Sequence, residues 1–396
     1  MIHFDILIIG SGPIALSCLY ALPSNLKIAV VTDGLTEKYT LDSLGDKAFI
    51  NSFGGGLDHW HGVISPELFL ELEPNGLDFF KSYFERIYPI KSDHLNQINK
   101  KSIFIPNSKI CTEHFKEEFN KKKNITLFVD KITSVKEKNN LVFALSNTQT
   151  YSAKKIIIAA GAIGTAKLIK QSYLGEVNSY IGNHLNAYGE YNIQINSNER
   201  VTKKTKLGHF KNVHTGNVKD QKYMTYVRPA LLDFKNPKKL IKFKTIYSRS
   251  VQQIYSTILK SSSPGLLVEA IYNRFGFWMA PNNANRYFQI ESNNIYYINE
   301  NFEIFVDKKN MSEQVKLLKK MESFSDLESD SIVSGIHYYN TIKEYDSSVG
   351  SLFETKDLNK KFLIADASIL KSIGGSHHTF SIMALAANSL RKIYDN

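Results

Sequence analysis

A glycine-rich turn between two short apolar runs, close to the start of the chain, constrains the fold more than any other feature. Residues 4–9 are almost wholly apolar, as expected for a parallel strand buried on both faces. They lead directly into Gly-Ser-Gly-Pro-Ile-Ala at 10–15, a helical stretch to about 22 and a second apolar run at 27–31. This order predicts a strand–turn–helix–strand unit and hence an α/β fold of the Rossmann type.

The residues of this turn predict a dinucleotide site. Gly10 makes a tight turn, Gly12 lets the main chain approach a pyrophosphate, and the small Ala15 lets the helix pack on the strand. Asp33 follows the second strand and is placed to accept hydrogen bonds from a ribose, with Thr32 as the alternative in that register. We therefore expect bound FAD or NAD(P).

A second glycine cluster follows at Gly54, Gly55 and Gly56. Three consecutive glycines are costly to order, so they indicate a main chain that passes close to a flat or charged group. His59 and His61 lie just beyond and flank a tryptophan. The sequence offers these two histidines no convincing third ligand, so we predict no metal site.

The rest of the chain predicts more of the first sheet and then a change of character. Short strands are expected at 126–129, 132–136, 142–146 and 150–152, with a buried strand at 155–160 that leads into Gly161 and a helix from about 166. Beyond 186 the chain is rich in Lys, Asn, Tyr and Phe, and strands of a second sheet are expected at 223–230, 287–291, 294–298 and 303–306. Helices are expected at 76–90, 109–119, 238–259 and 312–324.

Charge and composition bound the class of protein. The chain has 396 residues and a net charge of +11, and residues 201–260 hold fourteen Lys and Arg against two acids. This basic segment is either a solvated surface or a docking face for an anionic substrate or a membrane. Nucleic acid is not the expected partner, because no nucleic-acid motif accompanies the charge. Two cysteines, no long apolar run and no signal-peptide pattern predict a cytoplasmic protein, with peripheral membrane contact as the alternative.

The end of the chain reads as a buried strand at 363–368, a turn with the sequence Gly-Gly-Ser-His-His-Thr at 374–379, and a final helix at 380–393. The start of a helix presents unpaired N–H groups and the positive end of the helix dipole, which suits negative charge. We expect this turn to face a flavin whose other end lies at the glycine turn of residues 10–15.

Together these features resemble the glucose–methanol–choline (GMC) family of flavin oxidoreductases. The matching stretches are 10–15, 54–60, 156–168, 181–185 and 362–385. The Gly-Gly-x-x-x-His-Trp form of the second stretch is similar to that of sugar-oxidising members, namely pyranose oxidases and glycoside 3-dehydrogenases. The resemblance implies a discontinuous Rossmann-type FAD-binding domain at 1–187 and 328–396, and a mixed-sheet substrate-binding domain at 188–327, as in the glutathione-reductase-like FAD fold.

The resemblance also implies which residues contact FAD and which act on the substrate. Besides the residues of the first turn, the expected FAD contacts are Gly54, Gly55, Gly56, His59, Gly161, Asp366, Ala367 and Thr379. Covalent attachment of FAD through His59 is an alternative to non-covalent binding. The catalytic pair implied by position is His337 as general base and His377 as its partner, and His378 is the neighbouring register for the second position. The other histidines, including His184, are expected to be structural.

The expected function is therefore oxidation of a CH–OH group of a sugar or glycan to a carbonyl, with hydride transfer to N5 of FAD and an electron acceptor that the sequence does not identify. Histidine suits proton removal because its pKa lies near neutral pH. The alternatives are oxidation of a sterol or long-chain alcohol, and a non-catalytic flavin-binding scaffold that docks an acidic partner through residues 201–260.

Overall fold

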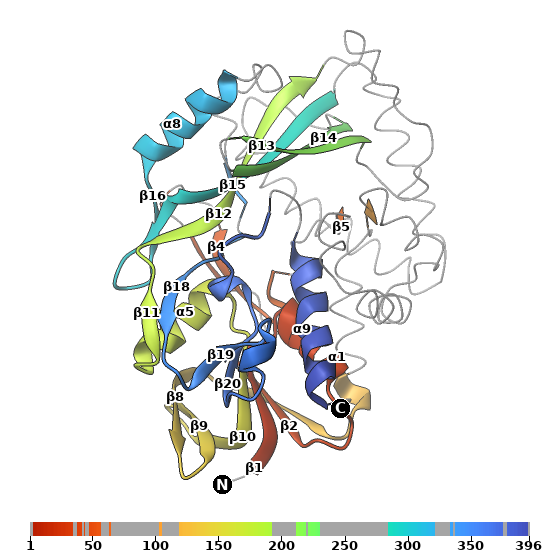
Figure 1. Ribbon diagram of the computed structural model, residues 1–396, viewed down its shortest axis with the longest axis vertical. Helices are drawn as coiled ribbons and strands as arrows, with labels where there is room; N and C mark the ends of the chain where they lie inside the picture. Colours follow the sequence, from red (N-terminus) through yellow and green to blue (C-terminus); the bar gives the residue numbers. More distant parts are fainter. Residues whose placement is uncertain are drawn as a thin grey trace.

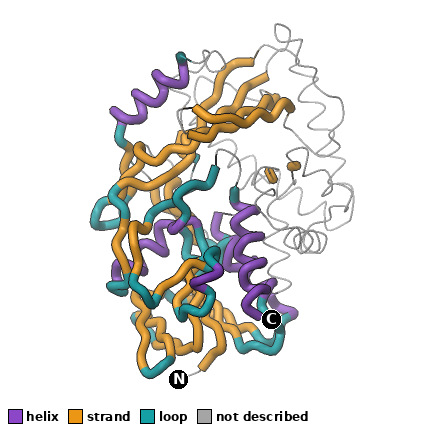
Figure 2. The backbone as a smooth tube through the Cα atoms, viewed as in Figure 1, coloured by secondary structure: helices purple, strands orange, loops and turns teal. Residues whose placement is uncertain are grey.

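The computed structural model describes most of the chain outside one long stretch and several shorter ones. The described residues are 3–34, 38–41, 43, 47–56, 63–64, 103–104, 119–191, 211–218, 221–229, 284–320, 333–335, 337–374 and 378–394. Figure 2 traces them as helices, strands and loops, with a strand-rich lower part and a strand-rich upper part.

The larger sheet confirms the predicted Rossmann-type α/β architecture. Its strands follow the order β19-β20-β10-β1-β2-β7, and every neighbouring pair along this path is parallel. The strands are β1 (His3–Ile9), β2 (Ile28–Thr32), β7 (Ile125–Val129), β10 (Thr150–Ile158), β19 (Val349–Ser351) and β20 (Phe362–Ile364). Strand β9 (Leu141–Ser146) extends the sheet by pairing antiparallel with the first half of β10, and β8 (Ile132–Lys138) pairs antiparallel with β9.

Helices cover both faces of this sheet. Helices α1 (Pro13–Ala21) and α9 (Thr379–Tyr394) lie side by side on one face (Figure 1), and Phe380 and Leu390 of α9 are fully buried there. Helix α5 (Ala162–Gln171) packs on the other face, where it also contacts β8. Because the second halves of β1 and β10 are covered on both sides, their side chains at 6–9 and 156–158 are apolar at successive positions and do not alternate.

A second, six-stranded sheet forms the upper part of the molecule in Figure 1. Its strands are β12 (Tyr180–Tyr191), β13 (Lys211–Val218), β14 (Gln221–Pro229), β15 (Ala284–Ile298), β16 (Ile304–Val306) and β17 (Val333–Ser334). All of its pairings are antiparallel. Helix α8 (Lys308–Lys319) follows β16. This sheet includes part of both proposed domains, since β12 begins at Tyr180, while the domain division itself stays a prediction.

Smaller elements complete the described structure. They are the strand pairs β3 (Lys38–Leu41) with β4 (Lys47–Asn51), β5 (Val63–Ile64) with β6 (Ile103–Phe104) and β11 (Gly175–Val177) with β18 (Ile342–Tyr345), and the 3-10 turns η5 (Thr355–Asp357) and η6 (Ala367–Ile369).

Several element boundaries differ from those expected. The strands predicted at 150–152 and 155–160 are one strand, β10, because Ala153 continues the buried face between them. Likewise, 287–291 and 294–298 are both part of β15. Helix α5 begins at Ala162 and not near 166, because Gly161, with φ of 77°, ends the preceding strand segment and starts the helix. The helices expected at 76–90, 109–119 and 238–259 fall largely or wholly outside the described residues.

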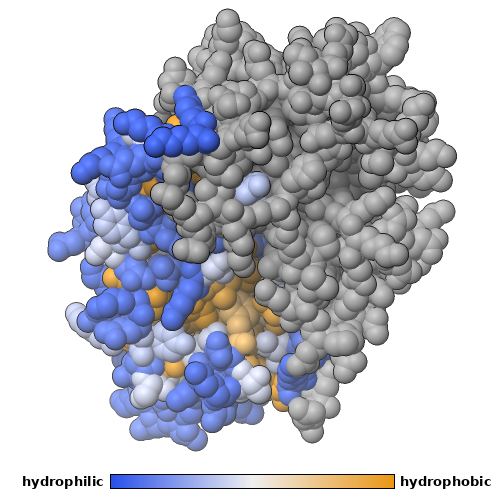
Figure 3. Space-filling model, turned by 45° about the horizontal axis from the view of Figure 1, so that its top comes forward, coloured by the Kyte–Doolittle hydropathy of each residue, from blue (hydrophilic) through white to orange (hydrophobic). Residues whose placement is uncertain are grey.

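Among the helices that the structure describes, none is long and apolar enough to cross a bilayer. Figure 3 shows hydrophilic residues over most of the described part of one face, with an apolar area near its centre.

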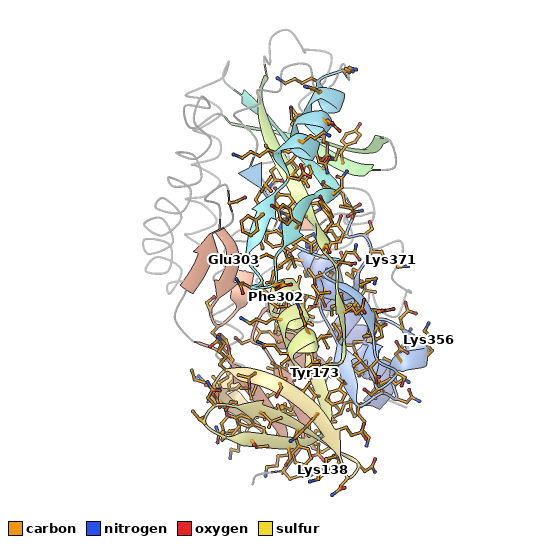
Figure 4. The ribbon with its side chains drawn as sticks, turned by 90° about the vertical axis from the view of Figure 1, so that its left-hand side faces the viewer. Lys138, Tyr173, Phe302, Glu303, Lys356 and Lys371 are labelled. Atoms are coloured by element: carbon orange, nitrogen blue, oxygen red, sulfur yellow. The ribbon has the colours of Figure 1, made fainter. Side chains whose placement is uncertain are left out.

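The side of the molecule in Figure 4 has an open surface hollow of about 1020 Å³ beside Tyr173 and Phe302. The ammonium groups of Lys167 and Lys170 lie 5.9 and 5.6 Å from the centre of the Phe302 ring. The described lining of this hollow contains no histidine, so the candidate site lies elsewhere.

Candidate functional site

In the first glycine turn, the fold requires a glycine at position 10, whereas the space beside Gly12 is open. Gly10 has φ of 109°, its N–H donates to the carbonyl of Val31 at 2.8 Å, and a Cβ there would lie 2.2 Å from the carbonyl oxygen of Ala159. Gly12 has an ordinary φ of −72° and is the residue before helix α1. A Cβ on Gly12 would meet no atom of the described chain within 4 Å.

The second glycine cluster lies directly against this turn. The N–H of Gly54 donates to the carbonyl of Ser11 at 2.8 Å. Gly55 has φ of 55°, and a Cβ there would lie 3.1 Å from Cα of Gly12, while a Cβ on Gly56 would meet nothing described within 4 Å. The glycine turn at 10–15 and the glycine cluster at 54–56 are therefore in direct main-chain contact.

The two candidate ribose ligands are in different environments. Thr32 is buried and its hydroxyl lies 2.7 Å from the hydroxyl of Ser11, so it braces the glycine turn. Asp33 is exposed at the carboxyl end of β2. This placement favours Asp33 over Thr32 as the residue available to a ligand.

Gly161 and Asp366 lie at the carboxyl ends of β10 and β20. Gly161 precedes α5, and a Cβ on it would meet nothing described within 4 Å. The Asp366 carboxylate is buried and accepts hydrogen bonds from the hydroxyl of Thr165 and, at 3.0 Å, from the N–H of Ser368. Burial raises the pKa of Asp366. These contacts make Asp366 a link between β20 and α5, and its predicted contact with FAD stays a prediction.

These residues fit a dinucleotide. A Cβ on Gly12, Gly56 or Gly161 would meet nothing described within 4 Å, and Gly12 and Gly161 immediately precede α1 and α5. Helix starts offer N–H groups and a positive dipole end to a pyrophosphate. The edge at the carboxyl ends of parallel strands is also where α/β sheets bind such ligands.

Three histidines from separate elements form a cluster. His184 lies on β12, His337 follows β17, and His378 immediately precedes α9, where its carbonyl accepts from the N–H of Ile382 at 3.1 Å. Nδ1 of His184 lies 2.9 Å from Nδ1 of His337. The ring centres of His337 and His378 are 4.6 Å apart, and those of His184 and His378 are 5.3 Å apart.

Main-chain pairing holds the His337 segment against β12. Gly182 and Tyr339 exchange two hydrogen bonds of 3.0 Å, and the N–H of Gly335 donates to the carbonyl of His184 at 2.7 Å. Between these points, Oδ1 of Asn183 accepts from the N–H groups of His184 and His337, each at 2.8 Å. The two imidazole rings therefore meet because their main chains are fixed on both sides.

A buried carboxylate positions the loop before α9. Glu291 lies opposite His184 in the β12–β15 ladder. Its two oxygens accept from the hydroxyl of Ser372 at 2.9 Å and from the N–H of Ile373 at 2.8 Å. This clamp holds the next residue, Gly374, so that its carbonyl lies 2.6 Å from Nε2 of His184.

Burial sets the charge of the central histidine. His184 is fully buried, and desolvation lowers its pKa to about 4, against smaller raising effects of the Gly374 carbonyl and Glu291. The ring is neutral near pH 7.

The three candidate ring nitrogens lie within 4.8 Å of one another, which is compact enough for a metal ion. However, two nitrogens on a tetrahedral Zn²⁺ at about 2.0–2.1 Å would be about 3.3 Å apart, whereas the 2.9 Å between His184 and His337 is a hydrogen-bond distance.

The structure therefore brings together some of the predicted residues and adds one. His337 lies in the cluster, Thr379 is the first residue of α9, and the carbonyl of Ala367 accepts from the N–H of Asn340 at 3.1 Å. His59 and His377 lie outside the described residues, so their roles stay predictions. His378, the alternative to His377 as the second catalytic residue, is in the cluster. His184 was expected to be structural; its place within the motif stretch 181–185 was the available signal.

Comparison with known proteins adds little to this geometry. The sequence matches no protein-family model and no curated protein. Among solved structures, the chain is similar to formate oxidase from Aspergillus oryzae RIB40, in a structure on the effect of a mutation on FAD modification. The two chains are 11% identical, the match covers 99% of each, and the TM-score is 0.43. The parallel sheet and its glycine turns, and not this likeness, support the function proposed below.

Proposed function

We propose that the protein is an FAD-dependent oxidoreductase that oxidises a CH–OH group to a carbonyl, with His337 as general base. The observation that carries the proposal is the attachment of the histidine cluster to the edge of the sheet where the glycine turns lie. The hydroxyl of Thr341 donates to the carbonyl of Ala162 at 2.8 Å, at the start of α5. The N–H of Asn340 bonds to Ala367, just beyond β20. A flavin held by the glycine turns would thus reach the histidines.

Bound FAD would accept the hydride from the substrate carbon. The protein's part is to hold the hydroxyl and to remove its proton. His337 takes the proton, and the second histidine of the turn, His378 or His377, orients the hydroxyl and stabilises developing negative charge on its oxygen. The N–H groups at the start of α9 favour negative charge nearby.

We further propose that the substrate is a sugar or a sugar conjugate. The support is the sequence Gly-Gly-x-x-x-His-Trp that begins at Gly54, which is similar to that of sugar-oxidising flavoenzymes. The basic segment 201–260 is suited to an anionic group on such a substrate or on a nearby membrane.

Anaerobic reduction of the bound flavin tests the proposal. Sugars, glycosides, sterols and simple alcohols are each mixed with the protein, and the loss of flavin absorbance is followed. We expect a sugar or glycoside to reduce the flavin and His337→Asn to slow that step about 10²-fold or more. His3→Asn, a histidine change at the exposed start of β1, is the matched control and should leave the rate unchanged. Reduction at an unchanged rate in His337→Asn refutes the base, and a flavin that no alcohol reduces refutes the oxidoreductase.

A further inference from the structure

The hydrogen bonds of His184 determine where its proton lies. Its Nε2 is 2.6 Å from the carbonyl oxygen of Gly374. A carbonyl oxygen can only accept, so Nε2 carries the hydrogen. In a neutral imidazole the other nitrogen, Nδ1, then has a lone pair and can only accept.

The proton position on His184 in turn determines that on His337. Nδ1 of His184 and Nδ1 of His337 are 2.9 Å apart, within hydrogen-bond distance. Because Nδ1 of His184 accepts, Nδ1 of His337 must donate. Neutral His337 then carries its hydrogen on Nδ1 and its lone pair on Nε2.

We propose that His184 is a positioning residue that holds His337 in the tautomer with a basic Nε2. The inference rests on the proposed function, in which His337 is the general base. During the reaction the O–H bond of the alcohol breaks and an N–H bond forms at Nε2 of His337, while the electron pair of the C–H bond leaves as hydride to FAD. The resulting imidazolium keeps its Nδ1–H bond to the lone pair of His184, which stabilises the positive charge.

The surroundings keep His184 neutral and in place. The groups that face its ring are His337, His378, the Gly374 carbonyl and, from the neighbouring strand, Glu291. Both carboxylate oxygens of Glu291 accept hydrogen bonds from the loop that carries Gly374, so the carboxylate fixes the acceptor of His184. The Glu291 carboxylate thus holds the Gly374 carbonyl, the carbonyl holds the neutral ring of His184, and that ring holds His337.

A matched pair of substitutions separates positioning of the base from support of the loop. In His184→Asn, the side-chain oxygen can take the place of Nδ1 and accept from His337, but the bond to Gly374 is lost. In His184→Gln, the longer amide can take the place of Nε2 and donate to Gly374, but the acceptor for His337 is lost. Positioning therefore predicts that His184→Gln is the more impaired, whereas support of the loop alone predicts the reverse order.

The kinetic readout is the rate of anaerobic flavin reduction by the substrate found in the panel, measured against pH. We expect His184→Gln to slow reduction about 10- to 100-fold and to move the acid limb of the profile to lower pH, because the imidazolium of His337 loses its acceptor. His184→Asn should stay within about 3-fold of the unchanged protein, with the acid limb in place. A slower His184→Asn than His184→Gln, or equal profiles for both, would overturn the proposal.

A spectroscopic readout tests the inference even if no alcohol reduces the flavin. Long-range ¹H–¹⁵N spectra of imidazole-labelled protein distinguish the two neutral tautomers, with His337→Asn and His184→Gln used for assignment. We expect Nε2–H on His184 and Nδ1–H on His337 near pH 7. An Nε2–H signal on His337 would overturn the inference, as would a divalent metal ion bound at one per chain and lost in His184→Gln.

Discussion

The side-chain oxygen of Asn183 accepts from the main-chain N–H of His337 at 2.8 Å, across 154 residues of chain. The same oxygen accepts from the N–H of His184, and the Asn183 amide donates to the hydroxyl of Ser334 at 2.9 Å. One fully buried side chain thus fixes the distance between β12 and the segment that carries the proposed base.

Asn183→Ala should therefore weaken both the fold and the site. The buried N–H of His184 and the partly buried N–H of His337 lose their acceptor, and an unsatisfied buried group costs about 1–3 kcal/mol. We expect a loss of about 2–4 kcal/mol in the free energy of unfolding, measured with urea. Flavin reduction should slow because His337 loses its fixed position.

Asn186→Ala is the matched control for that substitution. Asn186 lies on the same strand and is buried, but its Oδ1 has no hydrogen-bond partner among the described residues. Removal of this side chain should cost less free energy and leave flavin reduction nearly unchanged. An equal loss of stability in the two variants would contradict the role given to Asn183.

Gly335 is the second point at which the histidine segment is held. A Cβ there would lie 2.6 Å from Cβ of His184 and 2.8 Å from its carbonyl oxygen. Gly335→Ala should push β17 away from β12 and lower the free energy of unfolding by about 1–3 kcal/mol. Gly56→Ala, where a Cβ meets nothing described within 4 Å, is the control and should be neutral in the apoprotein. A stable Gly335→Ala with unchanged kinetics would show that the segment is free to shift.

The parallel sheet could be predicted from the sequence because its signals are local. The apolar run of β1, the turn at Gly10 and Gly12, and the run of β2 all lie within one short segment, and each has a direct physical reason. Element ends were less predictable, because the start of α5 depends on the conformation of Gly161.

The histidine cluster could be predicted only in part, because it depends on strand pairing. His184 and His337 are 153 residues apart and meet through the pairing of β12 with β17. Residues 181–186 of β12 are all buried, the polar ones included, so polar and apolar residues do not mark an exposed and a buried face of this strand. The sequence therefore does not indicate which of these side chains face the site. A histidine in such a run resembles an ordinary core residue until its partner strand is known.

Substitution by alanine should destabilise the apoprotein at one glycine of the first turn and leave it as stable as before at the other. Gly10→Ala places a Cβ 2.2 Å from a carbonyl oxygen at φ of 109°, so the apoprotein should lose about 2–4 kcal/mol of unfolding free energy. Gly12→Ala has no such conflict within the described chain, and its apoprotein should be as stable as the unchanged protein.

Gly12→Ala should instead weaken FAD binding, because its methyl group occupies the space left for the pyrophosphate. We expect the Kd for FAD to rise about 10-fold or more, which is about 1.4 kcal/mol. Titration of the apoprotein with FAD, followed by flavin fluorescence, measures this. Unchanged FAD affinity in Gly12→Ala would place the cofactor elsewhere.

The neutral state of His184 predicts how stability depends on pH. Its pKa falls from 6.5 in the unfolded chain to about 4 in the folded protein, chiefly because the ring is buried. Between these values the unfolded chain binds the proton and the folded protein does not, so the free energy of unfolding falls as pH falls from about 6.5 to about 4. The full loss is about 3 kcal/mol.

Urea unfolding of the apoprotein between pH 4.5 and 8 measures this loss. His184→Asn lacks the titrating ring, so its free energy of unfolding should decline less steeply below about pH 6.5. His3→Asn, at an exposed position, should match the unchanged protein. Glu291→Gln removes a negative charge that raises the pKa of His184, so its decline should extend to lower pH. Parallel declines in the unchanged protein and His184→Asn would mean that the folded protein protonates His184 as readily as the unfolded chain does.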